Sequence, residues 1–79
     1  MSRSPLPTYL QLVDFHRRRI LRFLTQGREA DARAALIRAE LWLEAYVCSA
    51  TSAAEASKFG RLREGILAQL REYFTTLVA

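Results

Sequence analysis

A run of basic residues beside an aromatic ring is the part of this sequence best suited to bind another molecule. Residues 16–19 read His-Arg-Arg-Arg, with Phe15 before them and Arg22 one helical turn beyond. Arginine and aromatic side chains are enriched at protein–protein hot spots, and they also suit phosphate contacts combined with base stacking. On a helix, one polar side carries the candidate binding residues of this run: Phe15, Arg18, Arg19 and Arg22.

The same residues also fit a simpler interpretation. Asp14 lies four residues before Arg18, the spacing of an ion pair on a solvated helix face. Arg17 projects into the apolar side of the helix, where its aliphatic stem can cover apolar surface while the charge stays in water. A contact of Arg17 with Glu40 or Glu44 is the alternative.

The sequence lacks the residue sets that catalysis and metal binding need. His16 is the single histidine and Cys48 the single cysteine, whereas structural zinc sites use four such ligands. No glycine-rich phosphate loop or paired-carboxylate motif is present. We therefore expect no enzyme activity, catalytic residue, metal, cofactor or small-molecule substrate. His16 is expected to be partly buried and hydrogen-bonded, and Cys48 to pack as a buried apolar group.

Local signals predict three helices, over residues 9–26, 29–50 and 53–77. Thr8 follows the last proline and can cap the first helix, and Gly27 suits the position just after a helix end. Residues 52–55 have the Ser-x-x-Glu form of a capping box. Strand and hairpin signals are scarce. Because the connections are short, the expected fold is all-α, a small three-helix antiparallel bundle.

Composition is that of one folded domain, with 51% hydrophobic and 25% charged residues. We expect a flexible leader over residues 1–7 and a single helical domain over residues 8–79. No apolar stretch approaches the roughly 20 residues that span a bilayer, and no signal peptide is evident, so a cytoplasmic location is expected. The net charge of +4 is unevenly distributed, because an acidic middle segment separates two basic segments. This distribution favours packing of the middle segment against the other two.

The predicted middle helix carries two apolar stripes. The main stripe contains Ala32, Leu36, Ala39, Leu43, Tyr46 and Ala50, and the opposite one contains Ile37, Leu41 and Cys48 with Ala34 and Ala45. A helix in a small bundle needs one apolar face, so the second stripe predicts self-association through this helix or contact with a partner. The alternative is a monomer whose middle helix is enclosed by the other two. The candidate apolar contact residues are Ile37, Leu41 and Trp42, although Trp42 also fits the core edge.

Residues 16–42 resemble one tetratricopeptide hairpin. Gly27, Ala32 and Ala39 match the small residues of that repeat at its turn and along its second helix. His16 replaces its tryptophan, and no proline closes the second helix. The resemblance implies an antiparallel, closely packed helix pair.

These features together predict a small non-enzymatic interaction protein. It would act as an inhibitor, adaptor or small chaperone that masks or bridges a surface of a larger protein, as a homodimer or with another protein partner. The alternative function is a nucleic-acid-binding regulator that uses the arginine face of the first helix.

Overall fold

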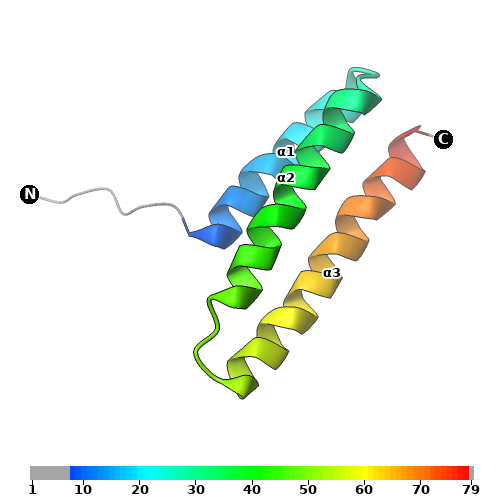
Figure 1. The fold of residues 1–79 in the computed structure, drawn as a ribbon. Helices are drawn as coiled ribbons and strands as arrows, with labels where there is room; N and C mark the ends of the chain where they lie inside the picture. Colours follow the sequence, from blue (N-terminus) through cyan, green and yellow to red (C-terminus); the bar gives the residue numbers. More distant parts are fainter. Residues whose placement is uncertain (1–7, 79) are drawn as a thin grey trace, which may run out of the picture.

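The computed structural model describes residues 8–78, which form three helices joined by short turns. These are α1 (Tyr9–Thr25), α2 (Glu29–Cys48) and α3 (Ala53–Val78). They run up, down and up, with α3 alongside α2 (Figure 1). The described residues contain no strand, so the predicted all-α, three-helix antiparallel fold is confirmed. The predicted leader over residues 1–7 lies outside the described residues.

Thr8 begins α1 with a reciprocal pair of hydrogen bonds. The Gln11 backbone N–H donates to the Thr8 Oγ1 atom over 3.1 Å, and the Thr8 backbone N–H donates to Gln11 Oε1 over 2.8 Å. This capping box satisfies two backbone donors at the helix start. The prediction that Thr8 caps the first helix is confirmed.

Gly27 lets the chain reverse between α1 and α2. Its φ of 73° is left-handed, a conformation that costs little only for glycine. The Gly27 N–H donates to the Leu24 carbonyl and the Arg28 N–H to the Phe23 carbonyl, which is the Schellman pattern. The helix ends at Thr25, one residue before the predicted bound.

The second connection begins two residues earlier than predicted, because α2 ends at Cys48. The Ser49 hydroxyl donates to the Tyr46 carbonyl over 2.6 Å and satisfies a carbonyl of the last turn. In the capping box of α3, the Ser52 hydroxyl accepts from the Glu55 N–H as predicted. The Glu55 carboxylate, however, accepts from the Thr51 N–H and hydroxyl, and these bonds lower the pKa of Glu55.

The core lies mainly between α1 and α2, which form the most extensive helix contact. Ala32, Ala35 and Ala39 are buried on α2, and their small side chains allow α1 to pack closely. The buried apolar residues are Val13, Ile20, Leu24, Ala32, Ala35, Ala39, Leu43 and Leu70. The antiparallel, closely packed hairpin that the first two helices were expected to form is therefore present.

The third helix is attached to α2 by both charge and ring contacts. Arg63 Nη1 lies 2.7 Å from Glu44 Oε2, and the Tyr46 and Phe59 rings stack with centroids 4.3 Å apart. A second ion pair joins Arg71 to Glu40. The predicted attraction between the acidic middle helix and the basic third helix is thus present.

Candidate functional site

The second apolar stripe of α2 faces outward. The exposed fractions of Ile37 and Leu41 are 58% and 65%, and Cys48 is also exposed. These residues lie on the side of α2 opposite the buried Ala32 and Ala39. As the alternative expected, α2 lies between α1 and α3, but these two helices do not enclose the second stripe. The expectation of a buried Cys48 thiol is wrong, because Cys48 ends α2 on its outer side.

Trp42 lies at the border between this stripe and the core. It is half-buried, and its ring packs against that of Tyr9 with centroids 6.0 Å apart. A groove of about 270 Å³ on the outer surface is lined by Arg38, Leu41, Trp42 and Ala45. Trp42 therefore occupies the core edge while one side of it lines a surface groove next to Leu41.

Arginine and phenylalanine alternate along one row of α1. The Arg19 Cζ atom lies 5.6 Å from the Phe15 ring centroid and 5.2 Å from that of Phe23. The Arg28 Cζ atom approaches the Phe23 ring to 4.7 Å. Guanidinium groups at these distances are attracted by the negative ring face. The four-residue spacing of Phe15, Arg19 and Phe23 could have revealed this row, but Phe23 and Arg28 were not among the predicted site residues.

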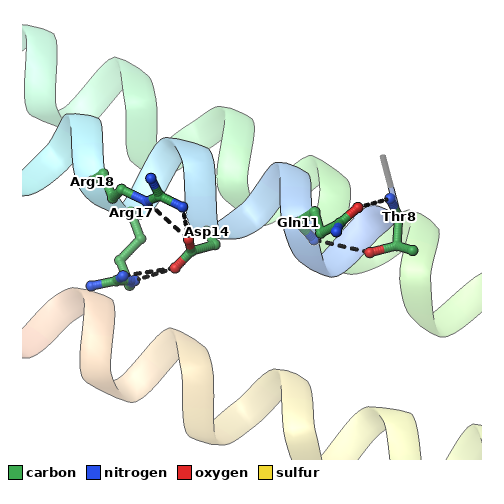
Figure 2. A network of polar contacts seen from close by, with 5 residues as sticks. All are labelled: Thr8, Gln11, Asp14, Arg17 and Arg18. Atoms are coloured by element: carbon green, nitrogen blue, oxygen red, sulfur yellow. Dashed lines mark hydrogen bonds and ion pairs between the residues drawn. The ribbon is translucent and has the colours of Figure 1, made fainter. Parts of the chain in front are cut away.

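Arg18 belongs to a different cluster. The Asp14 carboxylate accepts hydrogen bonds from Arg18 Nη2 over 2.7 Å and from Arg17 Nε over 2.8 Å, and it lies between the two guanidinium groups (Figure 2). These bonds hold the pKa of Asp14 below its usual value, with Arg18 the larger cause. The predicted Asp14–Arg18 pair is confirmed.

The other predicted contacts of the basic run differ from expectation. Arg17 does not reach Glu40 or Glu44, which pair with Arg71 and Arg63. Its guanidinium pKa is raised by Asp14 first and by the neighbouring Tyr73 second. Arg22 is exposed on α1 and has no carboxylate partner within the part of the chain described.

The four predicted basic and aromatic residues therefore do not form one contact cluster. Phe15 and Arg19 join the row that includes Phe23, whereas Arg18 is held by Asp14.

Arg38 connects the two parts of the candidate surface. It lines the groove beside Leu41 and Trp42, and it also lines a second groove that contains Arg19, Phe23 and Arg28. Within residues 8–78, neither Arg19 nor Arg38 has a carboxylate within ion-pair distance. The apolar stripe of α2 and the Arg19 row of α1 are therefore adjacent, and unpaired positive charge lies between them.

His16 lies beneath this surface. Its side chain is buried, as expected, but its Nδ1 atom lacks the expected hydrogen bond. The pKa of His16 is lowered mainly by burial, and secondarily by the charges of Arg19 and Arg38. Within residues 8–78, burial and the missing hydrogen-bond partner of Nδ1 make His16 a packed residue at the edge of the core.

Across residues 8–78, no three His, Cys, Asp or Glu side chains converge as a metal site would require. None of the three helices is both long and apolar enough to cross a membrane. Comparison of the chain with protein-family models, curated proteins and solved structures finds no match.

Proposed function

We propose that this protein is a non-enzymatic interaction module that binds protein through the outer face of α2. The observation that carries the proposal is the exposure of Ile37 and Leu41 on successive turns of one helix. Large aliphatic residues that are more than half exposed and adjacent leave apolar surface in water. Covering them with another protein removes that surface from water, the main favourable term in association.

The polar border of the stripe supports the same proposal. Arg38 and Trp42 line the groove beside Leu41, and arginine and tryptophan are the residue types most enriched at interface hot spots. The module would mask or bridge a surface, as inhibitors, adaptors and small chaperones do. We propose a cytoplasmic setting, where the exposed Cys48 thiol would remain reduced.

Nucleic-acid binding through α1 is the second candidate function. Arg19 and Arg22 are exposed and, within residues 8–78, unpaired with any carboxylate. Against it, Arg18 is held by Asp14, and Arg19 covers Phe15. Replacing Arg18, Arg19 and Arg22 by Glu would abolish binding to single-stranded or duplex oligonucleotides under this alternative. The wild-type affinity would also fall steeply as salt is raised.

The proposed function is tested by comparing the proteins that the wild type and an Ile37→Glu/Leu41→Glu variant retain. Each chain is immobilised and exposed to extract of the native cell, with quantitative mass spectrometry as the readout, and light scattering reports self-association. The matched control, Ala54→Glu/Ala68→Glu, places the same charge on exposed positions of α3. We expect the control to bind like the wild type and the α2 variant to lose its partners.

Circular dichroism on all three chains separates loss of binding from loss of folding. If the glutamates unfold the chain, Ile37→Ser/Leu41→Ser replaces them with smaller uncharged side chains. Equal retention of the same proteins by the wild type and a folded α2 variant would contradict the proposed function.

A further inference from the structure

The outer face of α2 has the spacing of a helix-pairing seam. Residues exposed on this side recur at alternating intervals of four and three: Ala30, Ala34, Ile37, Leu41, Glu44 and Cys48. Two helices that pack along their length use this alternation, because it keeps one row of side chains directed at the neighbour. The two large apolar members, Ile37 and Leu41, lie at the centre of the row, which suits a second helix as its occupant.

The intervals between the residues of this row are the same when they are read from either end. The midpoint of the row along the sequence falls at Ala39, which itself lies on the opposite, buried side of α2. We infer that α2 pairs antiparallel with α2 of a second copy of this chain, so that Ile37 of each copy meets Leu41 of the other. This inference rests on the proposed function and names the partner for that surface. Two-fold pairing also sets Ala30 against Cys48 and Ala34 against Glu44. It is self-complementary, as an interface between identical chains has to be.

Charge selects the antiparallel direction. A parallel pair would bring Glu44 of one copy beside Glu44 of the other, within the seam itself. The antiparallel pair puts Glu44 against Ala34 and next to Arg33 of the second copy. Within one chain Arg33 is paired with Glu29 and Glu44 with Arg63, and both residues remain exposed. The antiparallel direction therefore extends these ion pairs across the seam at two symmetry-related places and avoids a Glu44–Glu44 contact.

The size of the seam indicates a reversible dimer. Stable interfaces bury roughly 1,600 Å² in total, whereas here two large side chains per copy, Ile37 and Leu41, carry the apolar contact. Arg38 of the two copies also lies along the same edge of the pair, which opposes association. The dimer is therefore expected to form and dissociate over an experimentally accessible concentration range.

Sedimentation equilibrium over a concentration series tests the dimer. The wild type is expected to approach twice the 9.0 kDa chain mass as concentration rises. Ile37→Ser/Leu41→Ser is expected to raise the dissociation constant about tenfold or more, a change of at least about 1.4 kcal/mol. The control Leu62→Ser alters an exposed leucine of α3 and leaves the dissociation constant unchanged.

A wild type that stays monomeric at every concentration overturns the inference. If α2-dependent capture of other proteins persists in that case, the proposed function stands with a different partner. A dimer that is insensitive to Ile37→Ser/Leu41→Ser also overturns the inference, because it uses another surface.

Disulfide trapping tests whether the two copies of α2 run antiparallel. In the antiparallel pair Ala30→Cys places a thiol opposite Cys48 of the second copy, and a disulfide between them requires a Cα separation of roughly 4.4–6.8 Å. Mild oxidation is expected to give a covalent dimer from this variant and none from Ala30→Cys/Cys48→Ser. In the wild type, the two Cys48 thiols lie at opposite ends of the seam, about 27 Å apart along the helix axis at 1.5 Å per residue. Rapid Cys48–Cys48 linkage in the wild type would overturn the antiparallel arrangement.

Discussion

The His16 ring meets the ring of Phe15 edge-on, with centroids 5.2 Å apart and planes at 75°. His16 is buried on the core side of α1, whereas Phe15 is exposed beneath Arg19. The charged groups that lower the pKa of His16 come from two helices, Arg19 on α1 and Arg38 on α2. The candidate surface therefore lies directly over a titratable group whose pKa the fold lowers.

Stability is expected to fall as the pH drops below about 6.5, the ordinary pKa of His16. Because the folded pKa is lower, the unfolded chain takes up a proton first, so acid favours unfolding through this window. The contribution of His16 to the free energy of unfolding is complete above the pKa that His16 has in the unfolded chain. It is lost as the pH falls through the lower pKa that His16 has in the folded protein. Urea unfolding at pH 7.5 and pH 5.5, followed by circular dichroism, measures the difference. His16→Leu is expected to reduce it, and an unchanged difference would contradict this role for His16.

Replacing Ala39 by Leu is expected to destabilise the fold by about 1–3 kcal/mol, the usual range for overpacking a core. Ala39 is fully buried in the core on α2, so a larger side chain there has to displace its neighbours. The free energy of unfolding from urea titration is the measurement. Ala68→Leu makes the same change at an exposed position of α3 and is expected to have little effect. Equal effects would show that the α1–α2 contact is not closely packed.

Gly27→Ala is expected to destabilise the chain by roughly 1–2 kcal/mol, because an L side chain strains the left-handed backbone there. Gly65→Ala is the matched control. Gly65 lies inside α3 with open space around its Cα, and alanine favours a helix interior by up to about 1 kcal/mol. Thermal unfolding of the two variants should therefore shift in opposite directions. A stabilised Gly27→Ala variant would show that the turn tolerates other conformations.

Leu70→Ala is expected to weaken the attachment of α3. Leu70 is fully buried, and such truncations cost about 2–5 kcal/mol. Leu62→Ala changes a leucine of the same helix that is exposed, so a much smaller loss is expected. Urea titration compares the two, and a similar loss in both variants would mean that Leu70 does not anchor the helix.

The fold could be predicted from the sequence because its signals are local. Thr8 and Gly27 act through hydrogen bonds and dihedral angles within a few residues of themselves. The outward position of Ile37 and Leu41 followed from helical periodicity once Ala32 and Ala39 were assigned to the core. Each of these features depends on chain geometry that one helix or turn determines by itself.

Features that depend on neighbouring groups were predicted less well. Arg17 and Arg18 both lie within reach of Asp14, so the consecutive arginines diverge from the expected cluster. The groove that Arg38 shares with Arg19 and Phe23 exists only because of the way α1 lies against α2. Cys48 was placed correctly on the second stripe, yet it was expected to be buried, and no helix within residues 8–78 covers that side. Such features require the packed arrangement of helices, which residue spacing alone does not specify.

The uneven burial of the three helices also bears on how the molecule opens. Among the described side chains of α3, Leu70 is the one that is buried, whereas α1 and α2 enclose several between them. Local opening follows the least enclosed elements, so amide protons of α3 are expected to exchange with deuterium before those of the α1–α2 hairpin. Opening of α3 would leave the outer face of α2 in place, because that face belongs to the slower-exchanging hairpin.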